Sequence, residues 1–149
     1  MTRDAANRWS DPEVARRILT EWHVWAVVGC SPDPMRASNG VSRTLMRHGY
    51  EVIPVYPRET VIHGVETVPD LATAAAGRSP DSPIEVVDIF RASHRAGRHV
   101  DEAISIGARA VWLQLDVWDE VAAERAAVAG LLVVMDRCPA IDLPLLGIG

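Results

Sequence analysis

The sequence contains no lysine, so all 15 of its Lys and Arg positions are arginines. Catalysis through a lysine amine is therefore excluded. The sequence has only two cysteines, Cys30 and Cys138, which lie far apart and form no CxxC pair. This excludes a disulfide framework and a cysteine-based structural zinc site. The five histidines show no metal-ligand spacing, and we predict no metal site.

Long apolar runs and an excess of positive charge are also lacking. No apolar run approaches the roughly 18 residues that cross a membrane. Residues 1–17 contain no apolar segment of the kind found in a secretory signal. The net charge of −5 argues against a nucleic-acid partner. These absences, with the low cysteine count, predict a cytoplasmic protein that binds neither membranes nor nucleic acids.

The size and composition fit one globular domain. The chain has 149 residues, of which 48% are hydrophobic and 23% charged, and both fractions are ordinary for a domain with a single core. Asp11 followed by Pro12 is typical of a helix N-terminus, and Val14, Ile18 and Trp22 then share one helical face. We predict a single domain over 1–149, with an N-terminal helix at about 11–21 and a core at about 24–142.

Five apolar runs alternate with helical patterns along the rest of the chain. The runs lie within VWAVVG (24–29), RHGYEVIPVYP (47–57), IEVVDIF (84–90), SIGARAVWLQL (105–115) and VAGLLVVMD (128–136). Three of these segments contain a glycine that is typical of a helix end. Helices are expected around Val41 and Leu45, at about 70–76, from Val100 to Ile104, and from Val117 to Val128.

Solid apolar strands separated by helices are typical of a parallel sheet that is covered on both faces. Crossovers between parallel strands are right-handed. The pattern therefore predicts an α/β fold, a doubly wound (Rossmann-like) parallel sheet of about five strands with helices on both faces. Ligands of such folds bind at the carboxyl ends of the strands. The order of the strands in the sheet does not follow from the pattern.

The first of these strand ends lies in the segment AVVGCSPDPMRASNGVSRTL (26–45). A strand, a glycine and a helix N-terminus in that order commonly bind a phosphate. After Gly29, the Ser31 hydroxyl, the Arg36 guanidinium, the Ser38 hydroxyl and the free N–H groups of the helix start could hold a pyrophosphate. Gly29 alone would also suit any tight turn, and Ser38 would also suit a plain N-cap.

The second strand end narrows the choice of nucleotide. A nicotinamide site typically has G-x-G-x-x-G and an acidic residue about 20 positions later. Here only Gly29 is present, and Tyr56-Pro57-Arg58 stands where the acid would be. An arginine at this position suits a phosphate on the adenosine ribose, although Arg58 beside Glu59 could also be a surface pair. Coenzyme A and NADP both carry a pyrophosphate and a ribose phosphate, and both stay open at this point.

The chain resembles the standalone CoA-binding proteins, which correspond to the N-terminal nucleotide-binding domain of the succinyl-CoA synthetase alpha subunit. The resemblance runs from about residue 11 to 142. Four segments carry it: AVVGCSPDPMRASNGVSRTLMRHGYEVIPVYP, VVDIFR, GARAVWLQLDV and GLLVVMDRCPAI. Two positions depart from the usual pattern. Cys30 replaces a small apolar residue, and Tyr56 stands where asparagine is frequent.

The resemblance implies that coenzyme A or an acyl-CoA is the ligand and assigns parts of it to the strand-end loops. The phosphates would lie in the first loop, the adenosine end at the second, and the pantetheine arm along the third, with its thiol toward the last two. The predicted binding residues are Gly29, Cys30, Ser31, Arg36, Ser38, Tyr56, Pro57, Arg58, Phe90, Arg91 and Gln114.

The sequence shows no nucleophile–base–acid order, no metal cluster and no convincing carboxylate pair. We also expect no second domain carrying the histidine that becomes phosphorylated in a succinyl-CoA synthetase. We therefore expect a non-catalytic CoA or acyl-CoA binding protein, and a homodimer is a reasonable expectation for its size. The alternatives are a small NADP-linked oxidoreductase, a subunit of an acyl-CoA synthetase, or a regulatory partner protein with a vestigial site.

Three single residues carry separate expectations. Asp88 lies inside a run that is otherwise apolar, where an unpaired carboxylate would be costly, so we expect a structural partner for it. His94 and His99 are expected at the surface. We expect Cys138 to be a buried, inert thiol, and the alternative is disulfide exchange of Cys30 or Cys138 with the CoA thiol.

Overall fold

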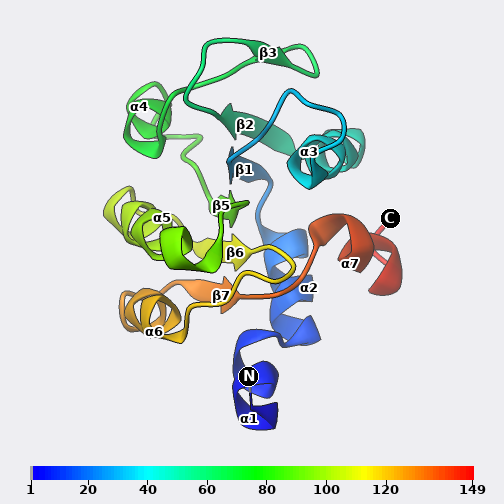
Figure 1. Ribbon diagram of the computed structural model, residues 1–149, viewed down its shortest axis with the longest axis vertical. Coiled ribbons are helices and arrows are strands. Elements are labelled where there is room, and N and C mark those ends of the chain that lie inside the picture. Colours follow the sequence, from blue (N-terminus) through cyan, green and yellow to red (C-terminus); the bar gives the residue numbers. More distant parts are fainter. Residues whose placement is uncertain (1) are drawn as a thin grey trace.

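Five parallel strands form the centre of the protein in a computed structural model that describes residues 2–149. The strands are β1 (Val24–Val28), β2 (Glu51–Val55), β5 (Val86–Ile89), β6 (Ala110–Leu113) and β7 (Leu132–Val134). They are arranged in the order β2-β1-β5-β6-β7, which Figure 1 shows from β2 near the top to β7. The parallel sheet expected from the sequence is confirmed, and its order is that of flavodoxin-like doubly wound folds.

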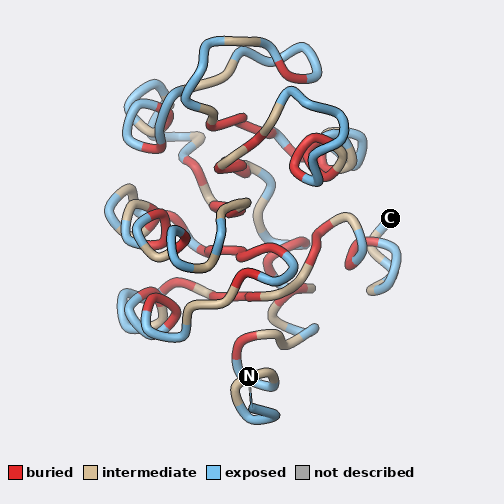
Figure 2. Tube along the Cα trace, viewed as in Figure 1, coloured by how far each residue is buried: buried red, intermediate tan, exposed pale blue. Residues whose placement is uncertain are grey.

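Helices cover both faces of this sheet (Figure 1). One layer consists of α4 (Leu71–Ala76), α5 (Ser93–Ser105) and α6 (Glu120–Val128), and the other of α2 (Pro12–Glu21), α3 (Ala37–Arg47) and α7 (Pro139–Leu145). Successive residues of β1 pack against opposite helix layers. Ala26 lies in the core under α4, α5 and α6, and Trp25 lies in the core under α2, α3 and α7. Figure 2 shows the buried residues along the strands and on the inward sides of the helices. This burial on both faces explains why the strands are continuously apolar.

The backbone at both edges of the sheet has partners outside the five strands. At the β2 edge, the Val68 N–H donates to the Pro54 carbonyl at 2.9 Å, and the Tyr56 N–H donates to the Val68 carbonyl at 2.9 Å. Beyond the end of β7, the Met135 N–H donates to the carbonyl of Trp9 at 2.6 Å. Trp9 is the last residue of α1 (Arg3–Trp9). The segment around Val68 and the end of α1 therefore cover the two outermost strands near their carboxyl ends.

Local signals account for several of the helix boundaries. The Asp11 carboxylate accepts from the Glu13 N–H at 2.8 Å, and Pro12 is the first residue of α2, as the sequence predicts. The sequence pattern predicts a helix from Val117 to Val128, and its predicted first residue is wrong. The structure begins α6 at Glu120 because the Asp119 carboxylate caps the helix and accepts from the Ala122 N–H at 3.0 Å.

Three elements were not predicted from the sequence: α1, α7 and a small antiparallel hairpin of β3 (Val61–Ile62) and β4 (Val65–Glu66). The hairpin turns at His63 and Gly64, both of which have positive φ, as this tight turn type requires. Its strands have two residues each, too few to show a period. Among residues 2–149, no helix has both the length and the apolar character needed to cross a membrane.

Candidate functional site

A cavity of about 690 Å³ opens at the carboxyl edge of the sheet, between the loops that follow β1, β2, β5 and β6. We refer to it as the carboxyl-edge cavity. Its volume lies in the range of small-molecule sites, and its position is that expected for a doubly wound fold. It is lined by Gly29, Ser31, Arg36, Ala37, Ser38, Val41, Tyr56, Pro57, Phe90, Arg91, Ala92, Gln114, Leu115, Asp116, Val117 and Cys138.

Gly29 joins three strand ends at the floor of this cavity. Its φ is +78°, and a Cβ at this position would lie 2.5 Å from the carbonyl oxygen of Phe90. Its N–H donates to the Val55 carbonyl at 3.0 Å. Glycine is therefore required here for both the left-handed conformation and the close approach of β1 to β5.

The loop after Gly29 is held by its two serines. The Ser31 N–H donates to Ser38 Oγ at 2.9 Å, and the Asp33 N–H donates to Ser31 Oγ at 3.1 Å. Both hydroxyl oxygens thus act as acceptors within the loop, and each hydroxyl still has a proton to donate to an anion. Ser38 is the second residue of α3, and Arg36 holds the N-cap position. The alternative that Ser38 is the N-cap is therefore wrong.

Besides the short helix α7, whose N-cap Cys138 also lines the cavity, two helices begin at the cavity without a side-chain cap. Neither α3 nor α5 has a capping hydrogen bond from its N-cap residue, Arg36 or Ala92, and both residues line the cavity. By contrast, the aspartates Asp11, Asp70 and Asp119 cap α2, α4 and α6. An uncapped helix N-terminus offers unpaired N–H groups and a partial positive charge. The two N-termini, together with the arginines at the cavity wall, favour an anionic ligand.

Buried polar atoms that have no partner lie at the same place. Arg91 Nε and Gln114 Oε1 are both buried, and neither has a hydrogen-bond partner within residues 2–149. Both residues line the carboxyl-edge cavity. Native proteins pair most buried polar groups, so two unpaired atoms in the residues of one wall set this cavity apart; the protein itself covers both atoms, and a ligand would reach them only after their side chains turn.

A smaller hollow of about 150 Å³ adjoins the cavity and shares Gly29, Pro57 and Arg91 with it. His99 lines this hollow and is buried, so the expectation of a surface position is wrong for His99; His94 is exposed as expected. The His99 Nδ1 lies 2.5 Å from Glu102 Oε1. Burial lowers the pKa of His99 despite the opposing effect of Glu102, which favours the neutral imidazole.

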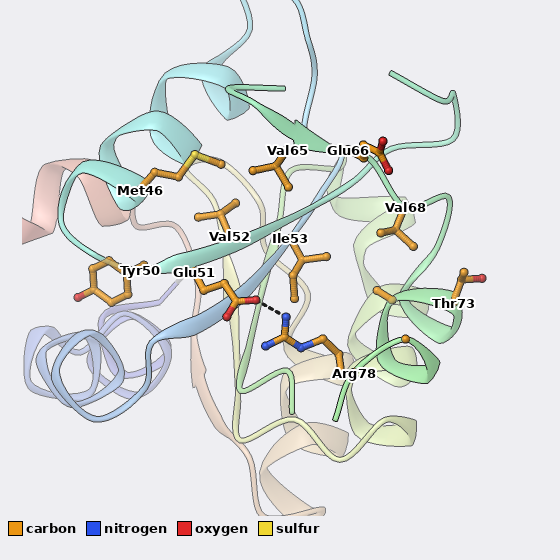
Figure 3. Close-up of a pocket in the computed structure, with 12 residues that line it drawn as sticks. Met46, Tyr50, Glu51, Val52, Ile53, Val65, Glu66, Val68, Thr73 and Arg78 are labelled. Carbon is orange, nitrogen blue, oxygen red and sulfur yellow. Dashed lines mark hydrogen bonds and ion pairs between the residues drawn. The ribbon is translucent and has the colours of Figure 1, made fainter. Parts of the chain in front are cut away.

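A separate open groove of about 640 Å³ lies at the β2 edge of the sheet, and Figure 3 shows the side chains that line it. Apolar side chains such as Met46, Val52 and Ile53 line it, and its Arg78 forms an ion pair with Glu51. None of the residues that line this groove contributes a buried polar atom without a partner. The groove therefore lacks the features that make the carboxyl-edge cavity the candidate site. Among residues 2–149, no group of three or more side chains could hold a metal ion.

Nine of the eleven predicted binding residues line the carboxyl-edge cavity, and Cys30 and Arg58 do not. Cys30 is fully buried, with its thiol 3.6 Å from Ser42 Oγ. Burial raises the pKa of this thiol, which disfavours the reactive thiolate. Arg58 is exposed beside the lining residue Pro57. The binding roles of all eleven residues stay predictions.

The far wall of the cavity was not predicted residue by residue. Leu115, Asp116 and Val117 line it, and the Asp116 N–H donates to Asp136 Oδ1 at 2.7 Å. Both aspartates have positive φ, +66° and +56°, an uncommon conformation that often occurs at functional sites. The sequence could have pointed to Asp116 and Asp136, because they follow the fourth and fifth strands of the sheet, where a doubly wound fold binds ligands.

Asp88 has no partner, contrary to the expectation from the sequence. It is fully buried in β5, and both of its carboxylate oxygens lack a hydrogen-bond partner within the part of the chain that the structure describes. Burial raises the pKa of this carboxyl well above its usual range. The folded protein therefore retains a proton that the unfolded chain releases near its ordinary carboxyl pKa.

This proton predicts a loss of stability with rising pH. The free energy of unfolding should fall as the pH rises from the unfolded-state pKa through the raised pKa, because the folded state binds the extra proton in that window. Asp88→Asn, which cannot ionise, should remove this contribution. Urea unfolding of both proteins at pH 5 and pH 8 measures it. We expect the free energy of unfolding of Asp88→Asn, relative to that of the unmodified protein, to be higher at pH 8 than at pH 5. A difference between the two proteins that does not change with pH would contradict the explanation.

Comparison with known proteins agrees with this fold. The model of the CoA binding domain family matches residues 23–144. A curated relative, the uncharacterized protein YneT of Bacillus subtilis (strain 168), is 34% identical over 123 residues, covering 83% of this chain and 87% of its own.

Solved structures are similar over most of both chains. Prb, a PH1109 protein redesigned for binding, is 37% identical with a TM-score of 0.81, covering 93% of this chain and 94% of its own. A hypothetical protein from Pyrococcus horikoshii OT3 is 36% identical with a TM-score of 0.80, covering 91% of each chain. The family match spans most of the chain and its Rossmann-like sheet. The chain belongs to the CoA binding domain family.

Proposed function

We propose that the carboxyl-edge cavity binds coenzyme A or an acyl-CoA and that the protein is a non-catalytic binding module. The observation that carries the proposal is the convergence of two uncapped helix N-termini, those of α3 and α5, on one cavity with two arginines in its wall. This combination suits a ligand with several phosphate charges. Membership of the CoA binding domain family supports the choice of coenzyme A.

The lining residues divide the cavity into two parts of different chemistry. Around the start of α3, Ser31, Arg36 and Ser38 supply hydroxyl and guanidinium donors for the pyrophosphate. Toward the end of β6, Leu115 and Val117 supply apolar surface for the pantetheine arm. A polar end and an apolar end in one cavity match a ligand that has a charged nucleotide and a neutral arm.

The adenosine end is assigned to the loop after β2. Tyr56 and Pro57 line the cavity there, and Arg58 is the next residue, exposed at the rim. In this proposal Arg58 contacts the ribose phosphate from outside the cavity, where solvent weakens the contact. The chain's residues bind and orient the ligand, and no proton or group transfer is assigned to them. The cytoplasmic location and the homodimer remain part of the proposal.

Calorimetric titration with coenzyme A tests this function, with NADP and NADPH as comparators. We expect saturable binding of coenzyme A in preference to both. Arg36→Ala should weaken it roughly tenfold to a hundredfold, because a charge-assisted hydrogen bond contributes about 1.5–3 kcal/mol. Arg43→Ala is the matched control: Arg43 is exposed on the same helix and does not line the cavity, so its removal should leave affinity nearly unchanged. A preference for NADP or NADPH, or no binding of any of the three, would overturn the proposal.

A further inference from the structure

Exposed apolar side chains lie at one end of the carboxyl-edge cavity and continue outside it. Leu115 lines the cavity and is 47% exposed, while Ile141 and Leu145 on α7 are 52% and 68% exposed. Cys138, the N-cap residue of α7, lines the cavity beside Leu115. Single exposed apolar side chains are common on protein surfaces, but a continuous set of them marks a binding surface.

The residues of α7 lead away from the cavity along one side of the helix. The Ile141 N–H donates to the Cys138 carbonyl at 3.1 Å, which brings Ile141 within one turn of the cavity wall. Ile141 and Leu145 are four positions apart and are therefore neighbours on the helix surface. Helical side chains lean toward the N-terminus of their helix, so Ile141 leans toward the end at Cys138. We call Cys138, Ile141 and Leu145 the α7 track.

The exposed side of α7 is entirely apolar. Its exposed residues are Ile141, Pro144 and Leu145, and Figure 2 shows this outer side of the helix in pale blue. A surface helix typically presents charged and polar residues to water. The exposed side of α6 does so with residues such as Glu124 and Arg125. An apolar partner is therefore expected for α7 and not for α6.

The charges next to the α7 track are already paired. Arg137 donates from Nε and Nη2 to the carboxylate oxygens of Asp142, and from Nη1 to the Ser10 carbonyl. Asp142 is buried on the inner side of the helix. This ion pair leaves no free charge for a ligand of α7, so the track offers apolar contact only.

The position of the track restricts its occupant to a continuation of the ligand in the cavity. The proposed function places the pantetheine arm along Leu115 and Val117, so an acyl group on its thiol would leave the cavity beside Cys138. From Cys138 to Leu145 the helix rises roughly 10 Å, at about 1.5 Å per residue. A chain of about eight carbons joined by bonds of about 1.5 Å has a similar length.

We propose that the α7 track binds the acyl chain of an acyl-CoA, so that the site prefers a ligand with an apolar chain of medium length to coenzyme A itself. This inference rests on the proposed function and adds the chemical class of the acyl group.

The test is calorimetric titration with coenzyme A, acetyl-CoA and octanoyl-CoA. Acetyl-CoA carries the thioester without a long chain, so its comparison with octanoyl-CoA isolates the contact of the chain. We expect octanoyl-CoA to bind roughly tenfold more tightly than acetyl-CoA, because burial of apolar surface is favourable and an open helix face covers the chain on one side only.

Variants at exposed positions test the track itself. Ile141→Gln and Leu145→Gln, made separately, should each remove much of the preference for octanoyl-CoA and leave the affinity for coenzyme A unchanged. Glutamine is a good helix former, and both positions are exposed, so both variants should fold. Val128→Gln is the matched control, because Val128 is the exposed last residue of α6, as Leu145 is of α7, and does not line the cavity.

The outcomes separate this inference from the proposed function. If the unmodified protein binds none of the three ligands, the proposed function fails and the inference fails with it. If coenzyme A binds but octanoyl-CoA binds no more tightly than acetyl-CoA, the function stands and the role of the α7 track is overturned. Equal loss of the preference in Val128→Gln would also overturn it.

Sedimentation of the same variants without ligand tests the other use of an apolar helix face. We expect Ile141→Gln and Leu145→Gln to keep the oligomeric state of the unmodified protein. If both variants change the oligomeric state and keep the preference for octanoyl-CoA, α7 is an interface between copies of the chain, and the proposed acyl site is wrong.

Discussion

Replacing Gly29 with alanine is expected to destabilise the fold by about 3 kcal/mol and to abolish coenzyme A binding. Two costs add at this position. A left-handed conformation at φ +78° is unfavourable for alanine, and the new Cβ would lie 2.5 Å from the Phe90 carbonyl oxygen. That oxygen belongs to the backbone, so the ends of β1 and β5 must move apart. Urea unfolding and calorimetric titration measure the two effects.

Gly49→Ala is the matched control for this prediction. Gly49 has a similar φ of +89°, but an added Cβ would meet no atom within 4 Å. Only the conformational cost remains, about 1 kcal/mol, and it arises far from the cavity. We expect affinity for coenzyme A to be unchanged in this variant. Equal losses of stability and affinity in the two variants would show that the close approach at Gly29 has no role.

Arg137→Ala is expected to cost about 3–5 kcal/mol of stability, because it leaves a buried carboxylate unpaired. Arg137 donates from Nε and Nη2 to the two carboxylate oxygens of Asp142, at 2.8 Å each. The exposed fractions of the two side chains are only 16% and 3%. Arg137 also donates to the Ser10 carbonyl at 3.2 Å, which ties α7 to the connection between α1 and α2. Urea unfolding measures the loss.

Two further variants test whether burial of the ion pair causes the loss of stability in Arg137→Ala. Arg137→Met combined with Asp142→Leu removes both charges and should recover much of the lost stability. The ion pair of Arg125 and Asp101 has a similar distance of 2.8 Å but lies at the surface, so Arg125→Ala should cost no more than about 1 kcal/mol. If Arg137→Ala costs no more than Arg125→Ala, burial is not what makes the Arg137 pair important.

The sheet and its helices could be predicted because the signals were local and repeated. Every strand of the sheet is an apolar run, and the Asp11-Pro12 pair marks a helix start that the structure confirms. The missed helix α7 contains two prolines, Pro139 and Pro144, which obscure a helical pattern. The order of the strands depends on how the layers pack together, and no local pattern encodes that packing.

The candidate site was predictable at the level of loops and less so at the level of side chains. Strand ends at one edge of a parallel sheet must meet, so Gly29, Tyr56, Phe90 and Gln114 could be grouped from the sequence. The direction in which each side chain points could not be predicted from its place in the loop. Cys30 follows Gly29 directly, yet its side chain turns into the core toward Ser42.

Burial of polar side chains was the least predictable feature. His99 and Asp88 are polar residues that tertiary packing encloses without full hydrogen bonding. The position of His99 depends on which face of α5 meets the sheet, and the surface interpretation placed it on the wrong face. For Asp88 the sequence indicated burial but could not show that no partner reaches it.

The covered edges of the sheet have a consequence for the behaviour of the protein in concentrated solution. Exposed strand edges are templates on which other chains polymerise into extended sheets. Here the segment at Val68 occupies the hydrogen-bonding groups of Pro54 and Tyr56, and α1 occupies that of Met135. At these positions an incoming strand finds no free backbone partner. Addition of a strand from another copy of the chain is therefore disfavoured at these positions, which lie near the carboxyl ends of β2 and β7.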